Sequence, residues 1–90
     1  MAFVYILQCS DGTLYTGWTT DMERRLAAHN AGRGARYTRG RRPVQLVYLE
    51  GQQDRSSAQC REAALRRLSR SAKVQLIATH SPRLPLARHQ

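Results

Sequence analysis

Residues 3–18 read FVYILQCSDGTLYTGW, and this stretch decides how the chain begins to fold. Two runs rich in β-branched and aromatic residues, 3–9 and 13–18, flank a short polar segment that contains a glycine. Such runs favour β-strands, and a brief Ser-Asp-Gly break between them is typical of a hairpin turn. An antiparallel β-hairpin is therefore predicted at the start of the chain.

The length of the hairpin turn determines which side chains share a face of the sheet. A two-residue turn would place Tyr5 and Tyr15 on opposite faces. A three-residue loop, with Gly12 in its left-handed position, places both tyrosines on one face and sets Tyr5 opposite Gly17. The missing side chain of Gly17 then leaves room for the Tyr5 ring. The alternative is that Gly17 only marks a β-bulge.

The rest of the chain predicts three helices and one further strand. A helix is expected over 21–30, because Thr20 and Glu23 fit a capping box that would start it. Residues 31–43, AGRGARYTRGRRP, lack apolar periodicity and are expected to form a long basic loop. The remaining elements are a strand over 44–50 and helices over 56–69 and 71–80.

These elements define an α/β (α+β) fold class, in which helices flank a small three-stranded antiparallel sheet in the order β-β-α-β-α-α. A chain of 90 residues can bury one modest core. We therefore expect a single domain over 1–80. The two prolines in 81–90 predict a flexible C-terminal tail.

Charge and composition predict an anionic partner. Lys and Arg number 15 and Asp and Glu number 6, which gives a formal net charge of +9, and the isoelectric point is near 11.1. Such a chain attracts polyanions, with nucleic acid as the leading candidate. Cys9 and Cys60 have neither disulfide-framework nor zinc-site spacing. No apolar run approaches membrane-spanning length, so we expect a cytoplasmic protein without a membrane partner.

The first predicted helix carries two ionisable groups on its apolar side. Met22 and Leu26 mark this side at a spacing of four residues, and Arg25 and His29 fall on it, whereas Arg24 points away. Burying such groups without partners would cost several kcal/mol. Either carboxylates pair with them, or they face a cleft that binds an anion.

A candidate carboxylate lies on the second predicted helix. Glu62 is at the edge of an apolar stripe marked by Ala58, Ala64, Leu65 and Leu68. A single carboxylate beside a phosphate-binding cleft is a minimal Mg²⁺ ligand, which leaves several waters on the ion. The alternative is an ordinary surface glutamate. Arg66, one turn further on, is either a phosphate contact or helix surface.

The predicted basic loop offers charged groups and one aromatic ring directly after the helix of Arg25 and His29. Arginine forks suit phosphate contacts, and an aromatic ring can stack on the bases of single strands or distorted duplexes. The alternative is a solvated charge run. The candidate nucleic-acid-binding residues are Arg33, Arg36, Tyr37, Arg39, Arg41 and Arg42, with Arg66 from the later helix.

Five elements in order resemble a GIY-YIG nuclease domain, and the likeness covers residues 3–77. They are the Phe-Val-Tyr ending at Tyr5, the Tyr-Thr-Gly beginning at Tyr15, then Arg25, His29 and Glu62. The resemblance is closest to the small stand-alone members of the superfamily. The first motif lacks its glycine and isoleucine, and Arg66 replaces an expected lysine. The implied catalytic set is Tyr5, Tyr15, Arg25, His29 and Glu62, with Gly17 structural.

The resemblance implies a metal-dependent endonuclease that hydrolyses phosphodiester bonds in DNA, with structural preference, in DNA repair, recombination or processing. One Mg²⁺ or Mn²⁺ ion would be held by Glu62. Arg25 would stabilise charge on the phosphate, and Tyr5 would position water or phosphate. Either Tyr15 or His29 would be the general base. The alternative function is a module that binds DNA or RNA with little or no turnover.

Overall fold

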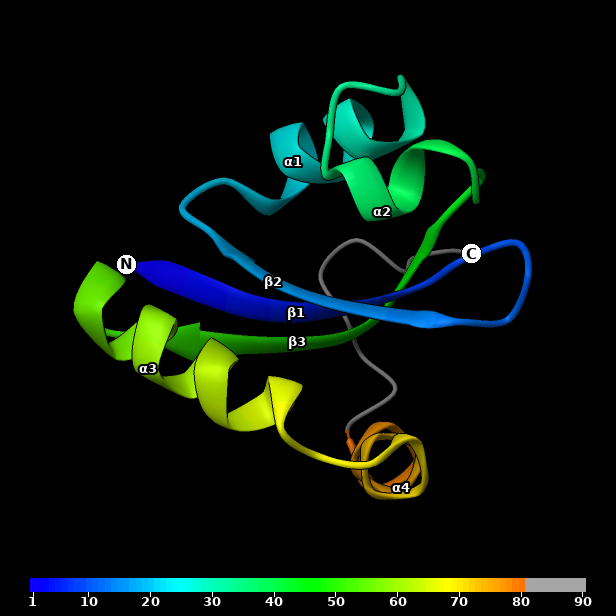
Figure 1. Ribbon diagram of the computed structural model, residues 1–90. Coiled ribbons are helices and arrows are strands. Elements are labelled where there is room, and N and C mark those ends of the chain that lie inside the picture. The colour runs from blue at the N-terminus through cyan, green and yellow to red at the C-terminus, as the bar shows by residue number, and fades with distance from the viewer. Residues whose placement is uncertain (81–90) are drawn as a thin grey trace.

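The computed structural model describes residues 1–80 and contains a three-stranded antiparallel sheet with helices on both faces (Figure 1). The predicted fold class and element order are thus confirmed, with one additional short helix. The predicted tail, 81–90, lies outside the described residues. The elements are β1 (Ala2–Gln8), β2 (Leu14–Thr19), α1 (Met22–Asn30), α2 (Arg36–Arg39), β3 (Gln45–Gln52), α3 (Arg55–Arg66) and α4 (Arg70–Thr79).

The hairpin has the three-residue loop and the register that put both tyrosines on one face. Gly12 adopts a φ of +86°, and Tyr5 pairs with Gly17 across β1 and β2. The pairing of these two strands runs without a shift, so Gly17 does not mark a bulge. A Cβ built on Gly17 would lie 2.5 Å from the Tyr5 hydroxyl oxygen. The glycine is therefore required by the ring that lies over it.

The central strand β1 is buried on both faces, because the sheet order is β2-β1-β3 and helices cover each side. Val4 and Ile6 pack with Leu65 of α3, whereas Tyr5 belongs to a second cluster with Met22 of α1. In Figure 1, α1 and α2 lie on one side of the sheet and α3 and α4 on the other. As a result, β2 is left as an edge strand with helices from both layers beside it.

Two predictions for the part of the chain between β2 and β3 need correction. Asp21, rather than Thr20, caps α1, since its carboxylate accepts the Arg24 backbone N–H at 3.1 Å. The Thr19 hydroxyl accepts the Asp21 backbone N–H and turns the chain one residue earlier than a Thr20 cap would need. The segment 31–43 is also not an uninterrupted loop, because the buried Thr38 anchors the one-turn helix α2.

The apolar stripe of α3 is narrower than predicted. Ala58 and Leu65 are buried, but Ala64 is exposed. The helix ends at Arg66, so Leu68 lies beyond it and is also exposed. Within residues 1–80 no helix is long and apolar enough to cross a membrane.

Replacing Gly17 with alanine is expected to lower the free energy of unfolding by about 1–3 kcal/mol, because the fully buried Tyr5 ring has to shift. Urea denaturation would measure the loss. Gly40→Ala is the matched control, since a Cβ at Gly40 meets nothing within 4 Å and its φ is −92°. Equal stability of the two variants would contradict this account of Gly17.

Candidate active site

Three strand and helix elements bring four of the predicted catalytic side chains together on the α1 side of the sheet. The ring centroids of Tyr5 and Tyr15 are 6.4 Å apart. His29 lies 6.0 Å from the Tyr5 ring and 5.4 Å from the Tyr15 ring. Arg25, one turn before His29 on α1, reaches the Tyr5 hydroxyl with its Nε at 3.4 Å. These groups therefore surround one point beside β2.

Hydrogen bonds through this cluster run in one direction. The Thr38 hydroxyl donates to the Ala35 carbonyl at 2.9 Å, so it accepts at 2.8 Å from the Nδ1–H of His29. The other ring nitrogen, Nε2, is then an acceptor, and the Tyr5 hydroxyl donates to it at 3.0 Å. Arg25 Nε–H in turn donates to the Tyr5 oxygen. The bonds that Thr38 makes thus fix the tautomer of the histidine.

Burial keeps both His29 and Tyr5 neutral, and for His29 the nearby cation acts in the same direction. Burial, and secondly the charge of Arg25, lower the pKa of His29 to about 4. Burial also raises the pKa of Tyr5 above its ordinary value. The hydrogen bond to Tyr5 raises the pKa of Arg25, which stays charged. At neutral pH the Arg25 cation is therefore hydrogen-bonded to the neutral phenol of Tyr5, and this phenol is hydrogen-bonded to the neutral imidazole of His29.

Two residues that support His29 carry no recognisable signal in the sequence. Thr38, which belongs to α2, is fully buried, although it lies among arginines in a segment without apolar periodicity. Gly34 packs against the imidazole so closely that a Cβ there would overlap the ring. Thr38 and Gly34 follow α1 in the chain and fold back onto His29 at the end of that helix. No local sequence pattern predicts such contacts.

The predicted metal ligand reaches the same site from the opposite layer. α3 packs along the edge strand β2, and the Arg66 Nη2 lies 2.9 Å from Glu62 Oε2 and 3.2 Å from the Thr16 carbonyl oxygen. The Arg66 guanidinium carbon is 5.9 Å from the Tyr15 ring centroid. The Glu62 side chain is 17% exposed and that of Arg66 is 54% exposed. The carboxylate is thus paired with an arginine that also contacts β2.

A single carboxylate suits Mg²⁺, which binds one or two protein carboxylates and keeps waters or substrate oxygens as its other ligands. No group of three or more His, Cys, Asp or Glu side chains within residues 1–80 could enclose an ion. Glu62 therefore fits an ion that substrate and solvent also hold. A Zn²⁺ cage, which needs several protein ligands, does not fit the described residues.

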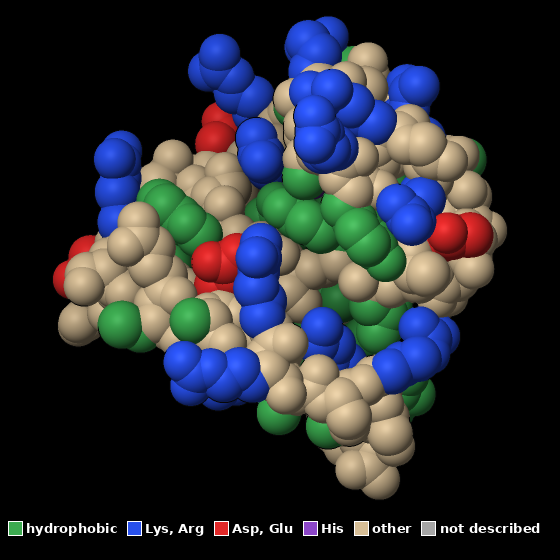
Figure 2. Space-filling model, in the orientation of Figure 1, with side chains coloured by type: hydrophobic (Ala, Val, Ile, Leu, Met, Phe, Trp, Pro, Cys, Tyr) green, Lys and Arg blue, Asp and Glu red, His purple; other side chains and the backbone are tan. Residues whose placement is uncertain are grey.

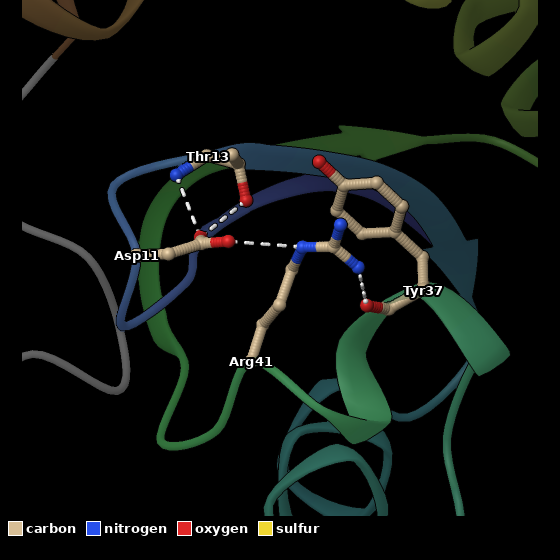
Figure 3. A network of polar contacts seen from close by, with 4 residues as sticks. All are labelled: Asp11, Thr13, Tyr37 and Arg41. Atoms are coloured by element: carbon tan, nitrogen blue, oxygen red, sulfur yellow. Dashed lines mark hydrogen bonds and ion pairs between the residues drawn. The ribbon is translucent and has the colours of Figure 1, made fainter.

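Arg41, one of the predicted phosphate contacts, contacts two other segments of the protein at the surface (Figure 3). Its Nε lies 3.0 Å from Asp11 Oδ2 in the hairpin loop, and its Nη1 donates to the Tyr37 carbonyl at 2.7 Å. The guanidinium carbon also lies 4.1 Å from the Tyr37 ring centroid. Hydrogen bonds from Thr13, and then the charge of Arg41, lower the pKa of Asp11. Arg41 thereby fixes the position of Tyr37.

Tyr37 stacks on Tyr15, with ring centroids 5.9 Å apart and planes inclined by 26°. Arg42 donates to the backbone carbonyls of Arg39 and Asn30 but remains exposed, and it lines an open hollow of about 560 Å³. The remaining arginines of the segment are exposed: Arg33, Arg36 and Arg39. On the face shown in Figure 2, Lys and Arg side chains lie on both sides of a band of hydrophobic side chains.

Comparison with known proteins finds one family and several relatives. A family model described as the GIY-YIG catalytic domain matches residues 1–75. UPF0213 protein CPE1444 of Clostridium perfringens is 53% identical over 81 residues, which cover 90% of this chain and 87% of that protein. A UPF0213 protein of Syntrophus aciditrophicus is 52% identical over 83 residues, covering 91% and 95%.

Two solution structures also resemble this chain. UPF0213 protein BH0048 of Bacillus halodurans has a TM-score of 0.58 and 44% sequence identity, and the match covers 91% of this chain and 89% of that one. Protein EF2693 of E. faecalis has a TM-score of 0.58 and 41% identity, with coverages of 91% and 92%. The predicted likeness to small single-domain proteins of this type is thereby confirmed.

Proposed function

Because the chain belongs to the GIY-YIG catalytic domain family, we propose that it is a metal-dependent endonuclease that hydrolyses phosphodiester bonds in DNA. The observation that carries the proposal is the convergence of Arg25, Tyr5 and His29 in one hydrogen-bonded cluster against Tyr15. A cation bonded to a buried phenol costs free energy and does not stabilise a core. An anionic substrate would pair with this cation.

The chemistry follows from the charge that develops on the phosphate. Attack by water adds negative charge to the non-bridging oxygens, and a cation fixed before the reaction stabilises it without reorganisation. Arg25 holds Tyr5 through its Nε–H, so its terminal N–H groups are the ones we assign to these oxygens. Tyr5 keeps the guanidinium in place, and His29 keeps Tyr5 in place.

We assign the general base to Tyr15 rather than His29. Both nitrogens of His29 have partners, and the imidazole is fully buried, so it contacts no attacking water. Tyr15 is half-buried and lies beside both His29 and Tyr37 at the surface of the cluster. As general base, Tyr15 would accept a proton from the attacking water.

Glu62 would hold one Mg²⁺ or Mn²⁺ ion, which would neutralise charge on the scissile phosphate and the leaving oxygen. The exposed arginines beside the cluster would bind the phosphate backbone without reading sequence. We therefore propose a structural rather than a sequence preference, and a role in DNA repair, recombination or processing. The candidate backbone contacts are Arg33, Arg36, Arg39 and Arg42.

Substituting Arg66 with glutamine is expected to tighten Mn²⁺ binding severalfold, because the guanidinium pairs with the carboxylate that would hold the ion. Electron paramagnetic resonance of free Mn²⁺ would measure the affinity of the protein without nucleic acid. Arg67→Gln is the matched control, since Arg67 is the exposed neighbour and removes the same charge. Equal affinities of the two variants would show that Arg66 and the ion do not compete.

An assay on branched, nicked and single-stranded DNA and on RNA, with and without Mg²⁺ or Mn²⁺, tests the proposed function. We expect cleavage that requires the ion and is lost in Tyr15→Phe, Arg25→Ala and Glu62→Ala. Cleavage that survives all three substitutions would exclude this site. Binding without cleavage on any substrate would favour the alternative, a nucleic-acid-binding module that keeps the nuclease fold.

A further inference from the structure

A groove outside the hydrogen-bonded cluster runs along the edge strand β2 and has a volume of about 340 Å³. It combines aromatic, cationic and hydroxyl groups from β2, α2, α3 and α4. Its volume is at the small end of the range for sites that hold organic ligands. The lining residues are Leu14, Tyr15, Thr16, Tyr37, Arg66 and Lys73.

The aromatic wall of the groove is a short stack of planar groups that is closed at one end. Arg41 covers Tyr37 with its guanidinium carbon 4.1 Å from the ring centroid, and Tyr37 stacks on Tyr15. At the other end the Arg66 guanidinium carbon stands 5.9 Å from the Tyr15 ring centroid, farther than Arg41 stands from Tyr37. The Tyr15 end of the stack, where the groove lies, is therefore less closely covered than the Tyr37 end.

Two cationic groups line the groove and would attract a ligand with a negative charge. Arg66 comes from α3, and Lys73, the only lysine in the chain, comes from α4 with its side chain half-buried. Both are suited to contact a phosphate group.

We propose that this groove holds one unpaired nucleotide adjacent to the scissile phosphate, with its base against the Tyr15 ring, which Tyr37 supports from behind, and its phosphate near Arg66 and Lys73. The inference rests on the proposed function, since Tyr15 belongs to both sites. A base inside a duplex is stacked on both faces and has no free face for these rings. The substrate class is therefore nucleic acid with at least one unpaired nucleotide at the cleavage site.

Metal-free binding measurements test the groove independently of catalysis. Fluorescence anisotropy would compare a perfect duplex with the same duplex carrying one unpaired 2-aminopurine nucleotide. We expect about tenfold tighter binding of the second, with quenching of the 2-aminopurine as it stacks. Equal affinity for both, or no quenching, would overturn the proposal.

Substitutions assign the effect to the groove. Tyr37→Ala and, separately, Lys73→Gln are expected to remove most of the preference for the unpaired nucleotide, and Tyr37→Phe to retain it. Arg70→Gln, which removes an exposed charge from the same helix as Lys73, is expected to leave the preference unchanged. A preference that survives both Tyr37→Ala and Lys73→Gln would place the nucleotide elsewhere.

The groove and the nuclease proposal can fail separately. Cleavage of fully paired and unpaired substrates at equal rates, with equal binding, would exclude the groove as a nucleotide site and leave the nuclease intact. Preferential metal-free binding of the unpaired substrate, with no cleavage under any condition, would exclude the nuclease and leave the groove as a binding site.

Discussion

Replacing Arg25 with glutamine is expected to reduce the rate of phosphodiester cleavage by about 10²–10³-fold, the usual cost of removing one preorganised donor at a developing anion. Arg25 is the cation bonded to Tyr5, and its pKa is raised by that bond, so it carries full charge at every working pH. Glutamine keeps a polar side chain but removes the charge and the fork of N–H donors. Single-turnover kinetics with saturating Mg²⁺ would measure the loss.

Arg24→Gln is the matched control for this loss. Arg24 is the preceding residue on α1 and is exposed, so its substitution changes the net charge of the protein by the same amount. We expect the Arg24 variant to cleave within a few-fold of the wild-type rate, with weaker binding at low salt at most. A similar loss in both variants would mean that Arg25 acts only through overall charge.

Acidification is expected to destabilise the fold through His29. The pKa of His29 is about 4 in the folded chain and near 6.5 in the unfolded chain, so the unfolded state binds more protons between these values. The stabilisation is fully present above pH 6.5 and is lost as pH falls through about 4. The shift corresponds to about 3 kcal/mol in the free energy of unfolding.

Urea denaturation at a series of pH values between 7 and 4 would measure this dependence. In His29→Gln the contribution of this group disappears, so the free energy of unfolding should vary much less over the same interval. His80→Gln, which removes a second histidine outside the cluster, should keep the wild-type slope. An unchanged slope in His29→Gln would contradict the assignment of the pH dependence to this imidazole.

Several elements of the site were predictable because they depend on short-range geometry. Alternation along a strand, together with the three-residue loop at Gly12, puts Tyr5 and Tyr15 on one face. The helical period puts Arg25 and His29 on the inner side of α1, where the structure buries the histidine completely. These periodicities are properties of single elements, so they are visible in the sequence.

Other elements depend on contacts between segments far apart in the chain. The sequence does not indicate that Thr38 fixes the histidine tautomer, or that Asp11 pairs with Arg41. It also leaves open whether Arg66 is surface or site, whereas the structure places its guanidinium against the Thr16 carbonyl of β2. Helical and strand periodicities relate residues only within one element, so they do not predict contacts between elements.

The sequence by itself therefore determined the inward pair on α1 and limited the hairpin to two registers, because backbone geometry dictates each within one element or one turn. Only the folded structure decided between those registers, and only the tertiary structure decided the hydrogen-bonding of His29, the contact of Arg66 with β2 and the groove beside Tyr15. Those features arise where α2 and α3 pack against β2 from opposite faces of the sheet. The distances between residues of different elements depend on this packing, and the spacing of residues along the chain does not predict them.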